Sequence, residues 1–462
     1  MTSRRWAATL AATALAAGVA VAPTLASGPA AAAPPAGGPP LTALGYGKQT
    51  LPTGDGWGSA GGGTTGGSAA TADQIHIATD RASLIEALGG DNATNAGNDV
   101  PKVVFVKGTI DGFEGPDGEL LDCQQLADPA YDFDEYLAAY DPAVWGWQER
   151  PHGPLAEARE RSMRNQEAQT VINVGPNTTI IGLDRGTLTH LTLMVNNADN
   201  VILRNLTFRD AYDCFPAWDP LDGASGNWNS NWDQLSVRRS ENVWIDHNSF
   251  LTSPDDLPEY FGRKFEVYDG QLDITHTADL VTVSHNIFRD HDKMMLIGST
   301  NNPDGGDPGR LNVTLRHNVF DGIGQRAPRM RFGKIDVYNN LFRVAVTANS
   351  FDFEYLWGVG VESQGYYENN YLDLRGSGVD PAEVIYEWGG TDLTEHGSWV
   401  RTGPGIGRPM SLLAAYNAGN DPPLGDDVGW TPQLRRGPVL PAPAVAAVVP
   451  LAAGAGKLPF LG

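Results

Sequence analysis

The sequence predicts an all-β fold, a parallel β-helix in which short strands stack coil upon coil. A phrase of about eight residues recurs three times, and two degenerate copies follow it: 243–250, 281–288, 313–320, 335–342 and 366–372. Within each copy apolar residues alternate with other residues at period two, which is typical of a strand with one buried face. The asparagines of successive copies are 38, 32, 22 and 30 residues apart, so the shortest complete repeat is 22 residues and the excess is loop. A fixed phrase at unequal spacing favours a solenoid.

Each copy of the phrase carries an asparagine at the same position: Asn248, Asn286, Asn318, Asn340 and Asn370. Stacked coils would bring these amides together, and we expect them to form a hydrogen-bonded ladder at the turns. The competing architecture is an antiparallel β-sandwich, for which turn signals should recur about every 8–12 residues. The unequal spacing of an otherwise constant phrase favours coils.

A histidine precedes the asparagine in the first three copies, at His247, His285 and His317. Equivalent positions on adjacent coils are about 4.8 Å apart, whereas zinc ligands lie about 2 Å from one ion. We therefore expect these rings to stack beside the asparagine ladder and not to bind zinc.

The first 33 residues have the layout of a secretory signal. Arg4 and Arg5 precede an alanine-rich apolar stretch, and cleavage is expected near Ala32. Both the general and the twin-arginine export routes are compatible with this layout. We expect a secreted, extracellular protein in which residues 34–45 form a flexible Pro/Gly-rich linker and residues 46–462 form one β-helix domain.

Other segments of the chain are predicted in order. Asp80 is a plausible N-cap for a short helix over 81–88, and a strand follows at 103–106. An aromatic and charged insertion at 118–169 contains a predicted helix over 156–166. Strand-rich sequence then continues to about residue 372. The Gly-, Pro- and Ala-rich segment 403–462 is expected to pack along the solenoid or to fray.

The chain is acidic, with 55 Asp and Glu against 32 Lys and Arg and a net charge of −23. Nucleic-acid binding would need a basic face that releases counterions, so this class of partner is excluded. No second apolar span predicts insertion into a membrane. The two cysteines, Cys123 and Cys214, are too few for a disulfide framework, although a single bridge is possible in an exported protein.

Three arginines lie within six positions of this acidic chain: Arg326, Arg329 and Arg331. Guanidinium groups stay protonated near neutral pH and repel one another, so their concentration indicates an anionic ligand. Strand alternation sends Arg329 and Arg331 to one face and Met330 to the other. Lys293, between charged residues and an apolar strand, is either a surface lysine or a further point charge for a substrate carboxylate.

A pair of carboxylates, Asp269 and Asp273, offers oxygen ligands for a hard cation such as Ca²⁺. In an extended strand they would be about 13 Å apart, so sharing an ion requires a bend, which Gly270 permits. Asp233 begins the preceding repeat, and a neighbouring coil could bring it alongside. The same residues could also be solvated turn aspartates.

Taken together, six ordered motifs resemble the calcium-dependent pectate lyases of polysaccharide lyase family 1. The match covers most of the chain after the predicted signal. The motifs are Thr64 to Gly67, Trp228 to Asp233, Val243 to His247, Asp269 to Asp273, Asp290 to Gly298, and Gln325 to Gly333. The resemblance implies a right-handed parallel β-helix with long loops and a few short helices. It also implies cleavage of α-1,4-linked polygalacturonate by calcium-assisted β-elimination, which yields 4,5-unsaturated oligogalacturonates.

The resemblance implies roles for individual residues. Asp233, Asp269 and Asp273 would ligate calcium, Lys293 and Arg331 would bind substrate carboxylates, and Arg326 would abstract the proton. An arginine base has a pKa of about 12.5 or higher in solution, so neighbouring cations and desolvation must depress the pKa of Arg326. We therefore expect an alkaline pH optimum.

The chain departs from the family pattern at two positions. Met294 stands where a small polar residue is common, and Asp336 replaces a histidine that usually follows the arginines. Neither position is assigned to catalysis. Asp336 is expected to place a negative charge near the arginines and so to bear on substrate preference.

Three other functions compete with this interpretation. A pectin lyase would act on methylated pectin without calcium, and it predicts aromatic residues along the cleft and no intact aspartate set. A hydrolase would use Asp269 and Asp273 as paired carboxylates that activate water, which leaves the basic residues without a role. A non-catalytic galacturonan-binding β-helix would keep the site without turnover. For an enzyme of this kind we expect a monomer.

Overall fold

The computed structural model describes residues 39–253, 256–344, 351–459 and 461, and the predicted signal segment 1–33 lies outside them. The first element, α1 (Leu41–Gly47), occupies part of the linker predicted over 34–45. Its Ala43 is fully buried in a cluster with Val103 and Phe105. Residues 41–45 are therefore helical, and Ala43 anchors them to an apolar face that the linker prediction did not take into account.

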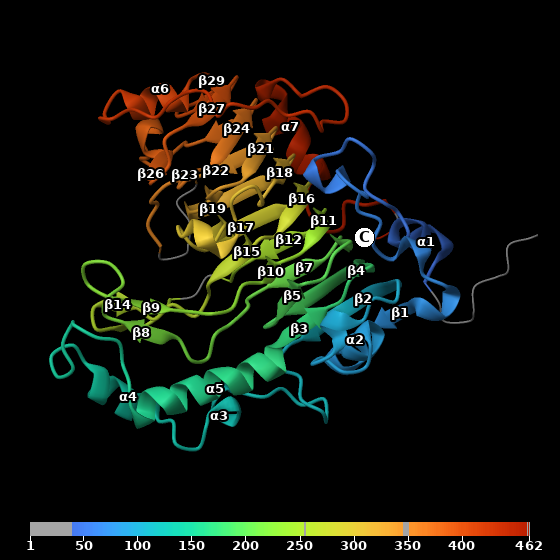
Figure 1. The fold of residues 1–462 in the computed structure, drawn as a ribbon, viewed down its shortest axis with the longest axis vertical. Coiled ribbons are helices and arrows are strands. Elements are labelled where there is room, and N and C mark those ends of the chain that lie inside the picture. Colours follow the sequence, from blue (N-terminus) through green and yellow to red (C-terminus); the bar gives the residue numbers. More distant parts are fainter. Residues whose placement is uncertain (1–38, 254–255, 345–350, 460, 462) are drawn as a thin grey trace, which may run out of the picture. The chain divides into compact units, whose positions relative to one another are not determined.

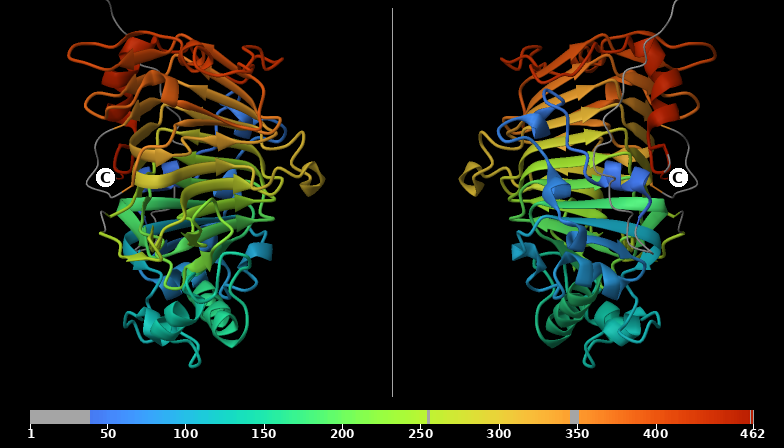
Figure 2. Two further views of the ribbon diagram at one scale, coloured as in Figure 1. Left: turned by 90° about the vertical axis from the view of Figure 1, so that its left-hand side faces the viewer. Right: turned by 90° about the vertical axis from the view of Figure 1, so that its right-hand side faces the viewer.

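Parallel strands wind into coils, and each coil contributes a strand to up to three faces (Figures 1 and 2). The first face contains β3 (Val171–Val174), β5 (Thr192–Asn196), β10 (Leu235–Arg238), β15 (Gly270–Thr275), the second half of β17 (Ile287–Ile297), β20 (Arg329–Met330), β23 (Trp357–Gly360) and β26 (Ile385–Trp388). We call it the site face, since every predicted site residue lies on it or at its edge.

The other two faces complete each coil. The second contains β1 (Ile75–Ala78), β2 (Lys102–Asp111), β4 (Thr178–Thr189), β6 (Val201–Arg204), β11 (Glu241–Asp246), β16 (Asp279–Ser284), β18 (Val313–Arg316), β21 (Lys334–Tyr338), β24 (Gln364–Glu368) and β27 (Leu393–His396). The third contains β7 (Thr207–Arg209), β12 (Ser249–Leu251), the first half of β17, β19 (Val319–Gln325), β22 (Leu341–Arg343), β25 (Tyr371–Asp373), β28 (Trp399–Arg401) and, antiparallel, β29 (Arg408–Pro409). The parallel β-helix is confirmed.

Each repeated phrase forms two strands joined by a sharp turn. In the first copy β11 ends at Asp246 and β12 begins at Ser249. His247 between them has a φ of 54°, in the left-handed region, and His285 and His317 share this conformation. The left-handed residue turns the chain from the second face to the third, so the turn is part of the repeat.

The predicted asparagine ladder is present and fully buried. The backbone N–H of Asn248 donates to Oδ1 of Asn286 at 2.8 Å, and the same bond links Asn286 to Asn318, Asn318 to Asn340 and Asn340 to Asn370, each at 2.9 Å. Each side-chain Nδ2 donates in turn to a carbonyl of an adjoining coil. The ladder therefore satisfies backbone groups that the turns would otherwise leave unpaired inside the protein.

Two aromatic stacks run parallel to the ladder. Phe250 and Phe288 stack inside the coils with their ring centres 4.7 Å apart. The predicted histidine stack is confirmed, with ring centres of His247 and His285 at 4.7 Å and of His285 and His317 at 5.1 Å. Like residues thus lie above one another at the coil spacing, which is what a constant repeat phrase requires.

The helices lie outside the coils. The predicted helix 81–88 is α2 (Arg81–Leu88), and Asp80 caps it with a bond from Ser83 N. The described residues also form the helices α3 (Cys123–Leu126), α4 (Phe133–Tyr140), α5 (Pro154–Thr170), α6 (Leu412–Asn417) and α7 (Ala442–Ala452). Short 3₁₀ turns in the same part of the chain are Trp57–Ser59, Gly66–Ala69, Ala72–Gln74, Asn95–Gly97, Pro303–Gly305 and Pro381–Glu383.

The insertion at 118–169 packs with two hairpins into an aromatic cluster at one end of the coils (Figure 1). The hairpins are β8 (Ala217–Asp219) with β9 (Asn227–Asn229), and β13 (Glu259–Tyr260) with β14 (Arg263–Lys264). Trp218 and Trp228 are buried at its centre. Cys123 and Cys214 form a disulfide that ties α3 to the loop after β7.

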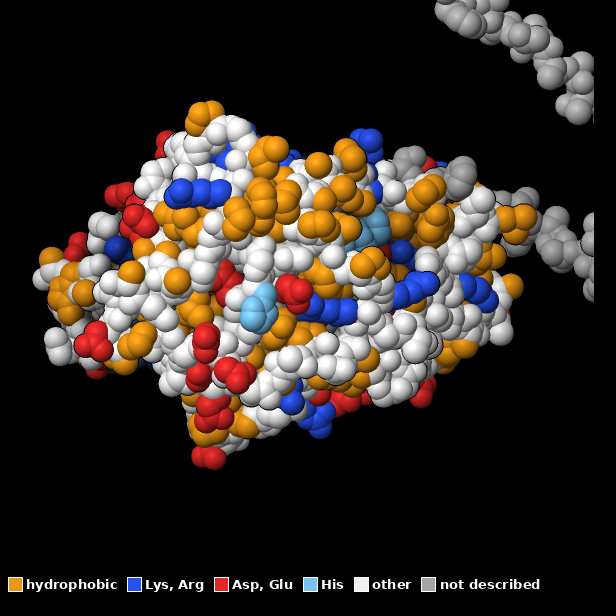
Figure 3. All heavy atoms as spheres, turned by 90° about the horizontal axis from the view of Figure 1, so that it is seen from above, with side chains coloured by type: hydrophobic (Ala, Val, Ile, Leu, Met, Phe, Trp, Pro, Cys, Tyr) orange, Lys and Arg blue, Asp and Glu red, His pale blue; other side chains and the backbone are white. Residues whose placement is uncertain are grey.

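The C-terminal segment packs along the coils and does not fray. Val445 and Val449 of α7 are buried against Leu341 and Tyr371 of the third face. At the end of the coils that carries α6, acidic side chains gather on one part of the surface and hydrophobic ones on another (Figure 3). In the described part of the chain, no helix has the length and apolar character needed to cross a membrane.

Replacing Asn318 by alanine should destabilise the fold strongly. The change leaves the N–H of Asn286 and the carbonyl of Val283 buried without their partners. At about 1–3 kcal/mol for each of the two unsatisfied groups, the free energy of unfolding should fall by about 2–6 kcal/mol. Urea denaturation measures the change. The matched control is Asn420→Ala, because Asn420 is exposed, and it should cost under about 0.5 kcal/mol. Equal losses in the two variants would contradict the ladder's role.

Candidate functional site

Two of the predicted metal ligands meet over Gly270 on the site face. Asp233 immediately precedes the β10 coil, and its Oδ1 accepts a hydrogen bond from the N–H of Gly270 at 3.0 Å. Asp273 lies in β15, and its Oδ1 accepts from Leu296 N at 3.1 Å. A Cβ atom on Gly270 would be 2.6 Å from Oδ1 of Asp233 and 2.8 Å from Oδ1 of Asp273. Both carboxylates therefore lie against the same glycine.

Gly270 is needed for space and not for the bend that the sequence suggested. Its φ lies outside the left-handed region, and β15 starts at this residue. Asp269 thus lies one residue before the strand and not within it. The missing side chain of Gly270 makes room for the carboxylates of Asp233 and Asp273.

The carboxylates of the three aspartates affect one another's ionisation. Burial, and then the charge of Asp269, raise the pKa of Asp233 to about 7. Burial and the charges of Asp233 and Asp269 raise the pKa of Asp273 well above its usual range, although Arg326 acts in the opposite direction. Two buried carboxyl groups that resist ionisation, beside a third carboxylate, have the donor set and the excess negative charge that suit a hard cation.

A different trio has the tightest set of potential metal ligands among the described residues. Ligand atoms of Asp246, His247 and His285 lie within 4.8 Å of one another, which those of the three aspartates do not. Asp246, however, already accepts hydrogen bonds from Arg204 at 2.9 Å and Ser284 at 2.6 Å. This trio is a buried ion-pair network at the histidine stack, on the second face.

Arg326 lies between β19 and β20, at the edge of the site face. It has a φ of 60°, and its carbonyl accepts from Met295 N at 2.7 Å. Burial acts to lower the pKa of Arg326, but the charges of Asp269, Tyr355, Asp273 and Asp292 outweigh it and raise the pKa. The expected depression is therefore wrong for the protein alone, because carboxylates and not cations dominate its surroundings.

Lys293 is one coil from the aspartates, paired in register with Gly270 on one side and Gln325 on the other. Its Nζ donates to Oε2 of Glu266 at 2.5 Å, and both side chains are largely buried. Although burial opposes it, the charge of Glu266 raises the pKa of Lys293. The ammonium is thus a fixed cation that already has an anionic partner, which sequence reasoning missed.

Arg331 also has partners within the protein. Its Nε donates to Oδ1 of Asn301 at 2.6 Å and its Nη1 to the carbonyl of Gly298 at 2.5 Å. Burial, together with the charges of Arg329 and Arg326, lowers the pKa of Arg331 to about 10. As predicted, Met330 points into the core while Arg329 and Arg331 do not.

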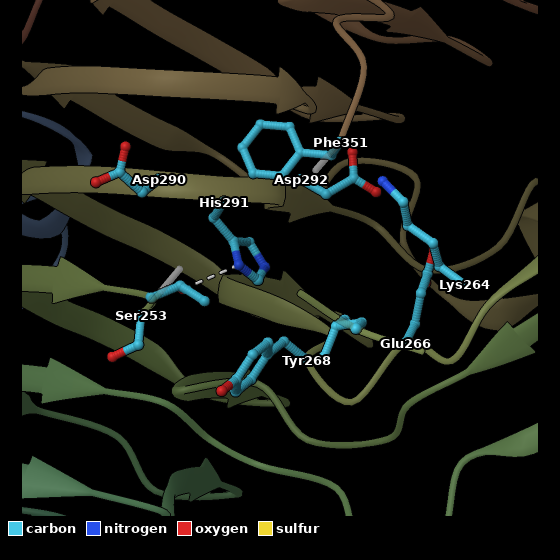
Figure 4. Close-up of a pocket in the computed structure, with 10 residues that line it drawn as sticks. Ser253, Lys264, Glu266, Tyr268, Asp290, His291, Asp292 and Phe351 are labelled. Atoms are coloured by element: carbon cyan, nitrogen blue, oxygen red, sulfur yellow. Dashed lines mark hydrogen bonds between the residues drawn. The ribbon is translucent and has the colours of Figure 1, made fainter. Parts of the chain in front are cut away.

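His291 contacts the backbone of the site and was not predicted as a site residue. Its Nε2 lies 2.5 Å from the carbonyl oxygen of Asp269, and its Nδ1 lies 3.0 Å from Oγ1 of Thr252. Burial lowers the pKa of His291 to about 4, so the ring is neutral. Figure 4 shows it at the centre of a pocket lined also by Glu266, Tyr268 and Asp292. In the sequence, only its position directly before Asp292 and Lys293 pointed to a place in the site.

The two departures from the family pattern lie away from this chemistry. Met294 is fully buried in the core. Asp336 lies in β21 on the second face and forms an ion pair with Arg435, whose Nε is 3.0 Å from its Oδ2. The expectation that Asp336 disturbs the arginines is wrong, because its side chain leaves the coils on another face and Arg435 balances its charge.

Comparison with known proteins identifies relatives over most of the chain. A profile of the family described as "Pectate lyase" matches residues 153–398. A pectate lyase of Bacillus subtilis (strain 168) is 40% identical over 423 residues, which is 90% of this chain and 95% of that one. The structure of the thermostable pectate lyase PL 47 matches with a TM-score of 0.84 and 41% identity, over 89% of this chain and 99% of that one. That of a pectate lyase bound to hexasaccharide matches with a TM-score of 0.81 and 39% identity, over the same shares.

Asp273→Asn should stabilise the protein when a chelator is present. A carboxyl whose folded pKa is raised destabilises the fold increasingly as pH rises from its unfolded value of 3.8. At pH 8 the variant should gain on the order of 1–3 kcal/mol in the free energy of unfolding, and the gain should vanish near pH 4.

Chemical denaturation at the two pH values measures this gain. The matched control is Asp222→Asn, which changes an exposed aspartate. A loss of stability at pH 8 in the Asp273 variant would show that its negative charge is compensated inside the protein.

Proposed function

This chain belongs to the pectate lyase family and is a polysaccharide lyase, and we propose that it cleaves polygalacturonate by calcium-assisted β-elimination with Arg326 as the base. The products are 4,5-unsaturated oligogalacturonates. Asp233, Asp269 and Asp273 hold the calcium ion, and Lys293 and Arg331 bind carboxylates of the substrate. No covalent intermediate with the protein is involved.

The observation that carries the proposal is the placement of the aspartates beside Arg326: the N–H of Leu296 donates to Asp273, and the N–H of the neighbouring Met295 donates to the carbonyl of Arg326. Asp269 and Asp273 both act on the pKa of Arg326, and Arg326 acts on that of Asp273. A base and a cation site this close suit a substrate that has an acidic C–H bond next to a carboxylate. The oxygen-only donor set, with two members that resist ionisation, fits calcium.

The reaction removes a proton from C5 of a galacturonosyl residue and expels the oxygen at C4. Arg326 takes the proton, the C–H electron pair forms the C4–C5 double bond, and the C4–O pair leaves with the departing sugar, which then gains a proton. Negative charge develops on the carboxylate next to C5, and Lys293 and Arg331 are fixed cations that stabilise it. A calcium ion held by Asp233, Asp269 and Asp273 would supply further positive charge near this carboxylate and would offset the charges of the aspartates.

The charge balance also decides when Arg326 can act as a base. In the protein alone, the aspartate charges keep its proton in place, because they raise its pKa. Neutralising Asp269 and Asp273 removes two of the charges that raise this pKa, so burial then weighs more heavily toward the uncharged form, although Tyr355 and Asp292 still oppose it. A cation-dependent base of this kind works best at high pH, and this supports the expected alkaline optimum.

We further propose that the protein is secreted and acts as a monomer outside the cell. The signal layout of residues 1–33 supports secretion. The disulfide between Cys123 and Cys214 adds support, because such bonds persist in oxidising compartments.

The direct test is ultraviolet absorbance of the unsaturated product on polygalacturonate at alkaline pH, with calcium and then with a chelator. The absorbance should rise with calcium and stop with chelator, and the rate should be higher at alkaline than at acid pH. Reducing ends without absorbance would mean hydrolysis. Activity that survives chelation and prefers methylated pectin would mean a pectin lyase.

Arg326→Ala should remove turnover and keep binding. A positioned base contributes about 10²–10⁴-fold to a rate, so kcat should fall by at least that factor, while the dissociation constant for oligogalacturonate changes little. Absorbance assays give kcat, and calorimetry gives binding. A variant that keeps more than a tenth of the wild-type kcat would remove Arg326 from the role of base.

Glu266→Gln should tighten the binding of polygalacturonate. Glu266 holds the ammonium that we assign to a substrate carboxylate, so the substrate must displace it or share it. The neutral amide should lower KM about threefold to tenfold with little change in kcat, because the effect is on binding. Exposed Glu259→Gln is the control for the loss of a negative charge nearby. A higher KM would show instead that Glu266 positions Lys293.

A further inference from the structure

A buried carboxylate that the proposed reaction does not use lies between two segments that carry proposed metal ligands. Asp213, in the loop after β7, is fully buried. Its Oδ1 accepts a hydrogen bond from the N–H of Phe215 at 2.8 Å. Its Oδ2 accepts from the N–H of Asn231 at 2.9 Å and from Nδ2 of the same residue at 3.3 Å. Asn231 lies two residues before Asp233, so the carboxylate of Asp213 holds the segment that leads to this ligand.

The backbone of Asp213 holds the segment that leads to Asp269. Its N–H donates to the carbonyl of Val267 at 2.7 Å. Val267 is buried and lies two residues before Asp269. Residues 230–233 and 265–269 belong to no helix or strand, so no strand ladder sets their positions. Asp213 thus joins the two segments through one residue.

The loop around Asp213 is itself anchored to the insertion. Oε1 of Gln166, in α5, accepts from the N–H of Cys214 at 2.9 Å. Nε2 of the same glutamine donates to the carbonyl of Tyr212 at 2.6 Å. The disulfide between Cys214 and Cys123 adds a covalent tie at the residue next to Asp213. The loop is therefore fixed on both sides of this carboxylate.

A tie of this kind matters for a metal site that is built from separate segments. Burial, and then the charge of Asp269, raise the pKa of Asp233, so the two carboxylates repel each other. Calcium binds oxygen ligands at about 2.3–2.6 Å, and its affinity falls when the segments that carry them separate. Partners that orient metal ligands commonly change metal affinity about 10- to 100-fold when they are removed.

We propose that Asp213 is a positioning residue of the metal site and that the disulfide between Cys123 and Cys214 keeps it in place. Asp213 sets the separation of the segments that carry Asp233 and Asp269, and it acts on calcium only through them. The inference rests on the proposed function, because it takes these aspartates as the ligands. Its consequence is that reduction of the disulfide weakens calcium binding.

The test is the dissociation constant for Ca²⁺, measured by calorimetry on the full chain without polysaccharide. Asp213→Asn keeps the size of the side chain but places an amide donor against the N–H of Asn231 or of Phe215. The dissociation constant should therefore rise about 10- to 100-fold. The double variant Cys123→Ser/Cys214→Ser keeps the hydrogen bonds of Asp213, so it should weaken binding less, by about threefold to tenfold.

The matched control is Asp210→Asn. Asp210 is buried in the same loop and accepts from the N–H and from Oγ of Ser253, both at 2.7 Å. This partner segment carries no proposed metal ligand. Chemical denaturation in chelator should show a loss of stability for Asp210→Asn as for Asp213→Asn, but the calcium affinity of Asp210→Asn should stay within about twofold of the wild type.

Hydrogen exchange in chelator gives a second measurement that does not depend on the metal. Peptides that cover 230–233 and 265–269 should exchange about tenfold faster in Asp213→Asn than in the wild type, and should be unchanged in Asp210→Asn. Exchange at the wild-type rate in Asp213→Asn would overturn the tie between the two segments.

The affinities separate this inference from the proposed function. A wild type that binds no calcium would overturn the proposed metal site. Calcium binding with an affinity in Asp213→Asn equal to that of the wild type would overturn only the role of Asp213, and the same result in the double cysteine variant would overturn that of the disulfide. If Asp213→Asn does not fold, the double variant decides, and unchanged affinity there would overturn the whole inference.

Discussion

The asparagine ladder fixes the register of the coils, and the site depends on that register. Each ladder amide bonds to the next coil and to a carbonyl of an adjoining coil, all in the buried interior. A slip of one residue in a coil would break these bonds and turn outward side chains inward. Asp273, Lys293 and Arg326 come from three repeats of different length, yet they lie close together. The ladder asparagines keep the same position in every coil, and only the loops differ in length.

The site concentrates charge that the fold alone does not balance. Asp233 and Asp273 resist ionisation because they are buried near a third carboxylate, and the same carboxylates hold the proton on Arg326. Buried carboxylates that are not fully paired cost stability, as functional sites commonly do. The cation proposed for these carboxylates would offset both effects, because it would lower the cost of ionising the aspartates and weaken their hold on the proton of Arg326. The arrangement is therefore costly as a structural element and useful as a reaction centre.

The sequence predicts those features that local chemistry determines. The ladder requires asparagine at a fixed place in every coil, and α2 requires a cap such as Asp80, so both were predicted correctly. The sequence could not predict pairs that form between distant segments. Arg435 is 99 residues from Asp336 and neutralises it, and Glu266 reaches Lys293 from the irregular segment before β15. These contacts depend on how a loop returns to the coils, for which no repeat gives a signal.

If Lys293 and Arg331 bind substrate carboxylates as proposed, the partners they already have would favour a polymer over a single sugar acid. Lys293 is held by Glu266 and Arg331 by Asn301 and Gly298, so a substrate carboxylate gains only the difference between its own interaction and the one it replaces. Such a difference is small at one position. Strong binding then requires several small gains along one substrate chain. The coils are evenly spaced, so they offer binding positions to the polymer at regular intervals.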